Sequence, residues 1–136
     1  MSNNKQSSVD KEFVPYEEAL ALKELGFDEP CFGWYQSSKL KKEYHPLKNS
    51  GNQSFMRKED CNAPTFSQAF RWFREKYNIH SYIDQLKEYN NKLVYDFVLV
   101  SEDGEDYEDN RRWKTCEEAE LECLRELIEI VQAGNK

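Results

Sequence analysis

Apolar residues that recur every three or four positions predict three helices along this chain. The expected helices span residues 15–25, 65–78 and 115–131. Start and stop signals support them, because Pro15 suits a first helical position and Gly26 and Asn78 suit helix ends. Thr65 and Thr115 each precede a Gln or Glu by three residues, which is the spacing of a capping box. All three segments are therefore expected to fold as amphipathic helices.

Segments between the helices are rich in β-branched and aromatic residues, which favour strands. The strongest expected strand is Leu93–Val100, and the tight-turn signal Asp103-Gly104 follows it. The other expected strands are residues 31–35, 54–57, 79–86 and 105–113. The sequence therefore predicts an α+β fold with the order α-β-(β)-α-β-β-(β)-α, in which an antiparallel sheet of three to five strands packs against helices.

Composition separates a tail from one domain. Residues 1–12 are rich in Ser, Asn, Lys and Gln, so we expect a disordered tail. Residues 13–132 hold all the expected helices and strands, and a chain of 136 residues is long enough for a single domain with one core. Within it, residues 36–61 are polar and contain Pro46, which indicates a long loop or a hairpin insertion.

The three expected helix starts resemble one another. Residues 16–19 read YEEA, residues 66–69 read FSQA and residues 116–119 read CEEA, so the starts are 50 positions apart. Two explanations stay open. Helix starts favour an acidic or polar pair, so the likeness can arise from capping chemistry alone, or the chain contains a duplicated α-β-β unit.

Charge is distributed unevenly along the chain, whose net charge is −7. Residues 1–100 hold fourteen Lys and Arg against fourteen Asp and Glu, whereas residues 101–136 hold five against twelve. This balance argues against nucleic-acid binding, which favours basic surfaces. The element order from residue 65 to 131 matches the double-stranded-RNA-binding arrangement, but glutamates stand where that module needs cations. We expect an acidic surface formed by Glu102, Asp103, Glu105, Asp106, Glu108 and Asp109.

The sequence shows no pattern typical of catalysis or of a cofactor site. The four cysteines lack the Cys-x-x-Cys spacing of zinc and redox sites, so we interpret them as small buried hydrophobes. A Cys31–Cys61 disulfide stays open, whereas Cys116 and Cys123 lie too far apart along one helix to pair. His80 is interpreted as an ordinary sheet residue, and no glycine-rich phosphate loop is present. We therefore expect no catalytic residues, no cofactor, no metal and no enzyme.

A tryptophan between arginines is the candidate for contact with a partner. The stripe Phe66, Phe70, Phe73 and Tyr77 is the expected buried face of the second helix. Trp72 lies roughly 120° from the centre of that stripe, at about 100° per residue. Arg71 and Arg74 flank it, and this composition is enriched at binding hot spots. We expect a neighbouring helix or residues 36–61 to cover Trp72; the alternative is that Trp72 is at least partly exposed and anchors a partner.

Three segments resemble a family of small uncharacterised proteins of gut Bacteroidales and their phages and mobile elements. The segments are residues 13–35, 63–83 and 117–131, less than half of the chain. The resemblance implies an intracellular accessory protein of phage or mobile-element origin. It implies no known activity, and so no site residues.

These observations favour two functions. The first is a protein-binding module, and the second is an acidic nucleic-acid mimic that occupies the DNA-binding site of a partner. No stretch approaches the roughly 20 apolar residues of a membrane span, so we expect no membrane partner. The first twelve residues lack the apolar core of a secretory signal, so we expect the chain in the cytoplasm, the host cytoplasm if a phage encodes it.

Overall fold

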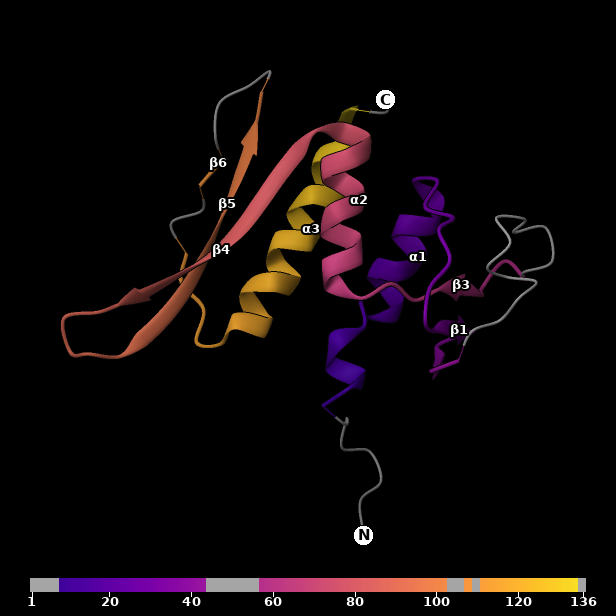
Figure 1. Ribbon diagram of the computed structural model, residues 1–136, viewed down its shortest axis with the longest axis horizontal. Helices are drawn as coiled ribbons and strands as arrows, with labels where there is room; N and C mark the ends of the chain where they lie inside the picture. The colour runs from indigo at the N-terminus through magenta and orange to yellow at the C-terminus, as the bar shows by residue number, and fades with distance from the viewer. Residues whose placement is uncertain (1–7, 44–56, 103–106, 109–110, 135–136) are drawn as a thin grey trace, which may run out of the picture. The chain divides into compact units, whose positions relative to one another are not determined.

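The computed structural model describes residues 8–43, 57–102, 107–108 and 111–134 (Figure 1). The chain falls into two compact units, residues 1–68 and residues 69–136. Their boundary lies inside the first turn of helix α2 (Phe66–Tyr77). This division differs from the single domain expected over residues 13–132. A boundary inside a helix carries none of the linker composition by which a sequence signals a domain boundary.

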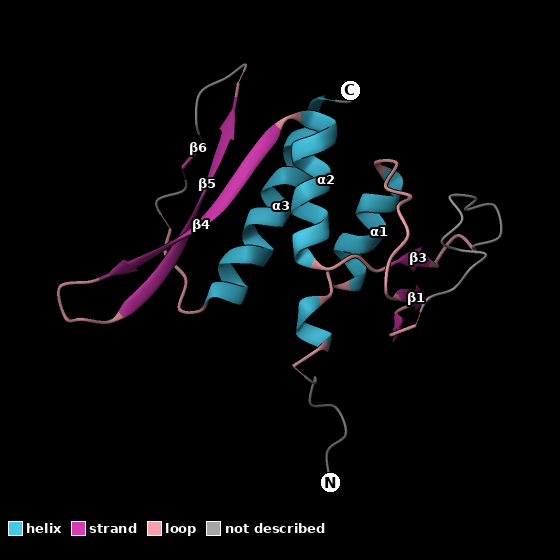
Figure 2. Ribbon diagram, viewed as in Figure 1, coloured by secondary structure: helices cyan, strands magenta, loops and turns pink. Residues whose placement is uncertain are grey.

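The first unit holds one α-helix and a short sheet. Its elements are the 3-10 helix η1 (Asp10–Glu12), the helix α1 (Tyr16–Glu24) and the strands β1 (Trp34–Gln36), β2 (Lys39–Lys41) and β3 (Cys61–Asn62). The strands are antiparallel in the order β2-β1-β3 (Figure 2).

The structure describes residues from position 8 onward, whereas the sequence predicted that the domain begins at residue 13. Residues 8–12 form a turn and η1, and Asp10 makes an ion pair with Lys42. The expectation of a disordered tail over residues 1–12 therefore does not hold for residues 8–12. Residues 1–7 lie outside the described residues.

The segment 36–61 was expected to be a long loop or a hairpin insertion, and its described beginning is a hairpin. β1 pairs with β2 through a two-residue turn in which Ser37 has a φ of 55°. The strand that returns to β1 is β3, whereas the sequence placed it at 54–57. Residues 57–60 instead form a turn, in which the N–H of Asp60 donates to the carbonyl of Arg57 at 3.0 Å. Residues 54–56 lie outside the described residues.

The second unit holds most of α2, a longer sheet and the C-terminal helix. Its other elements are β4 (Ile79–Lys87), β5 (Leu93–Ser101), β6 (Tyr107–Glu108) and α3 (Cys116–Gly134). The sheet is antiparallel in the order β4-β5-β6. The expected strands 79–86 and 93–100 are confirmed, and β6 lies within the expected third strand 105–113, of which residues 105–106 and 109–110 lie outside the described residues. The turn signal Asp103-Gly104 lies outside the described residues.

The expected helix caps are confirmed for α2 and α3. The backbone N–H of Gln68 donates to the Thr65 hydroxyl at 3.2 Å, and that of Glu118 donates to the Thr115 hydroxyl at 3.1 Å. Asn78 ends α2 with a φ of 55°, a left-handed conformation that asparagine tolerates better than most residues. These caps satisfy backbone groups that a helix end leaves without an intrahelical partner.

The α+β class is confirmed. Three strands lie between α1 and α2, where the sequence predicted one or two, and the described strands are divided between two sheets instead of one. All three helices begin at the expected 50-residue spacing, at Tyr16, Phe66 and Cys116. The two sheets nevertheless have different strand orders: the first strand after α1 is central, whereas the second strand after α2 is central. This difference favours capping chemistry over a duplicated α-β-β unit as the reason for the likeness.

Each unit has its own buried apolar residues. In the first they are Phe13, Val14, Ala19, Leu22, Phe27, Cys31, Trp34, Tyr35, Cys61 and Ala63. In the second they are Ala69, Trp72, Phe73, Val94, Phe97, Val98, Leu99, Ala119, Cys123, Leu124, Leu127, Ile128 and Val131. Helix α3 packs on β4 and β5, so its apolar side and the central strand form the core of the second unit.

Candidate functional site

The hairpin of β4 and β5 is closed by a turn that fixes its register. Residues 89–91 form a three-residue loop, in which Asn91 has a φ of 68°. The N–H of Asn91 donates to the Glu88 carbonyl at 2.8 Å, and the N–H of Glu88 donates to the Lys92 carbonyl at 2.9 Å. A type I turn followed by a left-handed residue gives this arrangement. It sets nine cross-strand pairs, from Ile79–Ser101 to Lys87–Leu93.

The same turn decides which way the backbone groups of β4 point. In an antiparallel ladder, hydrogen-bonded and non-bonded pairs alternate. Because Glu88 bonds to Lys92, the even-numbered residues of β4 bond to β5 and the odd-numbered residues point away. The two 2.9 Å backbone hydrogen bonds between Tyr95 and Trp113 agree with this alternation. They show that the odd-numbered Tyr95 of β5 points its backbone groups away from β4.

β4 is consequently an open edge of its sheet among the described residues. The strand order β4-β5-β6 places no strand beyond it. The outward N–H and C=O groups belong to Ile79, Ser81, Ile83, Gln85 and Lys87. An edge of nine residues is long, and β4 has no proline and only one lysine, at its last position. It therefore lacks most devices that proteins use to block strand addition.

One face of this hairpin packs on the core of the second unit. The Ser81 side chain lies close enough to the Cys123 thiol of α3 to lower the pKa of that thiol, against the larger effect of burial. Phe97 is fully buried and stacks on Trp113, with ring centroids 5.5 Å apart. The Arg111 guanidinium lies 5.2 Å from the centroid of the Trp113 ring. These contacts hold the odd-numbered side chains in place beside the open edge.

The other face of the hairpin combines exposed side chains of β4 with buried side chains of β5, among them Val94 and Val98. His80 is exposed, and Tyr82 is 54% exposed. Asp96 of β5 is buried and forms an ion pair with Arg112, in which Arg112 Nη1 lies 3.3 Å from Asp96 Oδ2. Asp84 stands directly opposite Asp96 in the register. The backbone of Asp84 bonds to β5, but its carboxylate makes neither a hydrogen bond nor an ion pair among the described residues.

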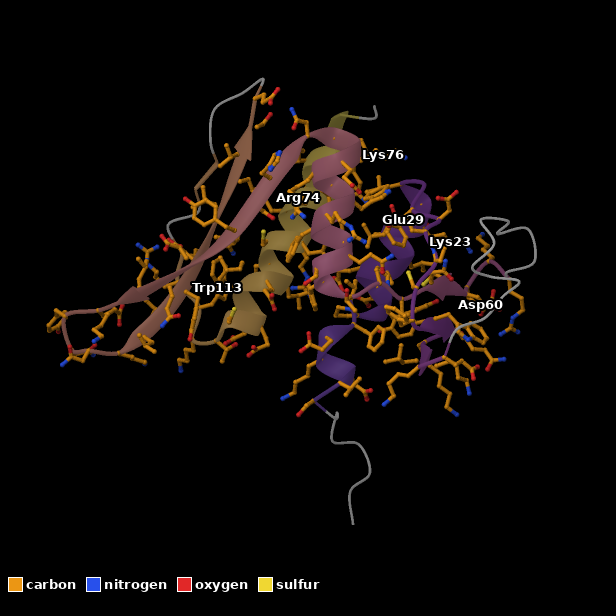
Figure 3. The ribbon with its side chains drawn as sticks, viewed as in Figure 1. Lys23, Glu29, Asp60, Arg74, Lys76 and Trp113 are labelled. Carbon is orange, nitrogen blue, oxygen red and sulfur yellow. The ribbon has the colours of Figure 1, made fainter. Side chains whose placement is uncertain are left out.

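The first unit contains a different polar cluster, at the turn before β3. The Lys23 ammonium donates to the carbonyls of Asp60, Arg57 and Lys58 at 2.8, 3.2 and 3.4 Å (Figure 3). The buried Asp60 carboxylate accepts from the Ser37 N–H at 2.8 Å and from Arg57 Nε at 3.3 Å. These groups satisfy one another and tie α1 to the sheet, so the cluster is structural.

Burial controls the chemistry of the cysteines. It raises the pKa of Cys31, Cys61 and Cys123 to about 12 from the ordinary 9.0, and it also raises the pKa of the half-exposed Cys116. These thiols are protonated at neutral pH and are poor nucleophiles. Cys31 and Cys61 are free, so the disulfide left open by the sequence is not formed. Nowhere in the described ranges do three or more potential ligands gather to hold a metal ion.

Trp72 is buried, with a side chain that is only 5% exposed. The expectation that it is covered is confirmed, and the alternative of an exposed Trp72 that anchors a partner is wrong. Phe73 and Tyr77 meet its ring edge-on at 5.1 and 5.5 Å, and the Lys76 ammonium lies 5.0 Å from its centroid. The buried residues of α2 are Ala69, Trp72 and Phe73, whereas Phe66, Phe70 and Tyr77 are half-buried. The buried side is therefore centred on the small Ala69 and not on the aromatic stripe.

Arg71 is exposed and Arg74 is half-buried on the same helix. A partner contact at these two arginines stays a prediction. The expected acidic surface also stays a prediction, because only Glu102 of that group has a described side chain, which is exposed. The side chains of Asp103, Glu105, Asp106, Glu108 and Asp109 lie outside the described residues.

Comparisons with known proteins find no relative: no protein-family model, no curated protein and no solved structure matches the chain. The resemblance to Bacteroidales proteins and their phages thus stays a prediction. Among the helices described, none combines the length and apolar character needed to cross a membrane.

Proposed function

We propose that this chain is a protein-binding module that uses the open edge of β4. It is an accessory protein of phage or mobile-element origin, acts in the cytoplasm of its host, and is not an enzyme. One observation carries the proposal: a nine-residue strand stands at the edge of its sheet with its outward backbone groups available. An extended segment of another protein binds such an edge by adding a strand.

The side chains beside the edge support this function. Tyr82 is exposed at the middle of β4, and Tyr89 is fully exposed at the tip of the hairpin. Tyrosine is enriched in protein interfaces because its ring gives a large apolar contact and its hydroxyl gives a hydrogen bond. Backbone pairing would supply affinity, and these rings would supply selectivity.

Gln85→Pro tests the proposal. Gln85 is exposed and its N–H points outward, so proline removes an edge donor without removing a bond to β5. Tagged wild-type chain, Gln85→Pro and the control Gln85→Ala are incubated with extract of the native host, and bound proteins are quantified by mass spectrometry. We expect Gln85→Pro alone to lose the bound protein while circular dichroism stays unchanged. Equal capture by all three chains would contradict the proposal.

The acidic nucleic-acid mimic is a second candidate, favoured by the charge of α3. This helix carries six glutamates against the single base Arg125, and Glu117, Glu118 and Glu129 are exposed. A mimic that replaces phosphates binds its partner through charge, so its affinity falls steeply with salt. Strand addition depends on backbone hydrogen bonds and responds weakly to salt. Affinity measured against salt concentration separates the two functions.

A further inference from the structure

Asp84 lacks a favourable charge partner within its own sheet. It stands opposite Asp96, whose carboxylate already pairs with Arg112. Like charges directly opposite each other destabilise a sheet. The side of Asp84 that faces away from β5 lies at the open edge, so a strand added there can bring a cation or a donor to it.

β4 itself offers that donor when a second copy pairs with it in the antiparallel direction. Only odd-numbered residues point their backbone groups outward, so odd must pair with odd and even with even. A twofold axis at Tyr82 satisfies this condition. It places Ser81 opposite Ile83 of the second copy and Ile79 opposite Gln85 of the second copy.

The same axis matches the exposed side chains. Tyr82 lies beside Tyr82 of the second copy, and His80 lies opposite Asp84 of the second copy, twice per pair. A histidine imidazole donates a hydrogen bond to a carboxylate and carries a positive charge when protonated. An axis at Ile83 also fits the backbone, but it places Asp84 opposite Tyr82 and His80 opposite Leu86, and so leaves Asp84 without a cation.

We propose that two copies of this chain pair through β4 about a twofold axis at Tyr82 and join their sheets into one. The inference rests on the proposed function, because it names the partner of the same edge. The interface is self-complementary, as a twofold interface must be. It is small, because it consists of one pair of strands, so the affinity is micromolar and a competing strand from another protein can displace the second copy.

Charge exchange tests both the pairing and its register. His80→Asp places two carboxylates opposite each other, and Asp84→Lys places a lysine opposite His80; each should raise the dimer dissociation constant about tenfold. The double variant restores opposite charges only in the Tyr82 register, so its dissociation constant should return to near the wild-type value. Glu129→Lys, on an exposed position of α3, is the matched charge control and should change nothing. Sedimentation equilibrium across the micromolar range gives the constants, and circular dichroism checks folding.

The outcomes distinguish this inference from the function on which it rests. A wild-type chain that remains monomeric, or a double variant that fails to recover, overturns the pairing about Tyr82. If the outward amides of β4 still exchange freely in that monomer, the open edge remains a binding surface for another protein. If those amides are protected in a dilute monomer, both proposals fail.

Discussion

The two sheets of this chain satisfy their backbone groups in different ways. In the first unit the strands are two or three residues long, and side chains from α1 and from β1 bond the surrounding backbone: Lys23 holds three carbonyls, and the Tyr35 hydroxyl donates to the Val14 carbonyl at 2.7 Å. In the second unit the backbone groups are satisfied by the nine cross-strand pairs of β4 and β5, on which α3 packs. A sheet closed by side chains needs only short strands, whereas a long ladder leaves one long edge available for binding.

The largest expected effect concerns the core beneath the long ladder. Phe97→Ala removes a fully buried ring that stacks on Trp113. It should lower the free energy of unfolding by about 3–5 kcal/mol. Urea unfolding followed by circular dichroism measures this loss. Tyr82→Ala, at an exposed position of β4, should cost less than about 0.5 kcal/mol; equal losses for the two variants would show that Phe97 does not lie in the core.

The next effect concerns the side-chain bonds of the first unit. Lys23→Met keeps most of the apolar stem but removes the donor for the carbonyls of Arg57, Lys58 and Asp60. It should lower the free energy of unfolding by about 1–3 kcal/mol. Lys58→Met, at an exposed lysine of the same turn, is the control and should cost almost nothing. If both variants unfold at the same urea concentration as the wild type, the turn is held by something other than Lys23.

Alkaline pH should weaken the first unit before the second. The folded state raises the pKa of Cys31 and Cys61 to about 12 from 9.0, so it favours the protonated thiols. This stability is fully present below about pH 9 and is lost as the pH rises towards about 12. The first unit holds these two thiols and Tyr35, whose pKa is also raised to about 12 by burial, whereas the second holds Cys123 alone among the strongly shifted groups described. Single-tryptophan variants that keep Trp34 or Trp113 report on the first or the second unit, and their fluorescence at increasing pH shows which unit unfolds first. Unfolding of both units at the same pH would contradict the prediction.

The smallest expected effect is that of salt on self-association. Backbone pairing is short-range, and the only charged contacts of the proposed interface are the two between His80 and Asp84, so the dimer dissociation constant should change less than about threefold between low and high salt. An interface governed by the acidic residues of α3 would instead respond over orders of magnitude. Sedimentation at several salt concentrations decides between these dependences.

Local signals in the sequence predicted most of the secondary structure. Thr65 and Thr115 fixed two helix starts, and Asn78 fixed a helix end, because capping depends on neighbours within a few residues. The returning strand β3 was misplaced because its pairing with Tyr35 bridges residues far apart in the chain. The buried side of α2 was also misplaced, since hydrophobicity marks the aromatic stripe but burial centres on Ala69.

The candidate site was missed although its residues lay inside a correctly predicted strand. Whether a strand is central or at an edge depends on which strands pair with it, and a single sequence does not state this. A weak signal was present, because Ile79–Lys87 mixes His80, Tyr82 and Asp84 into a strand that a central position would make more apolar. The alternative role of Trp72 as a partner contact was suggested by the arginines beside it along the chain, but its ring is covered.

Amide hydrogen exchange along β4, followed by NMR residue by residue, shows whether this edge is open. An open edge gives alternation in dilute solution: the N–H groups of Ser81, Ile83 and Gln85 exchange fast, and those of Tyr82, Asp84 and Leu86 exchange slowly because they bond to β5. At high protein concentration the fast group should become protected while the slow group changes little. Slow exchange at all six positions in dilute solution would mean that the edge is already covered, and binding through β4 would be ruled out.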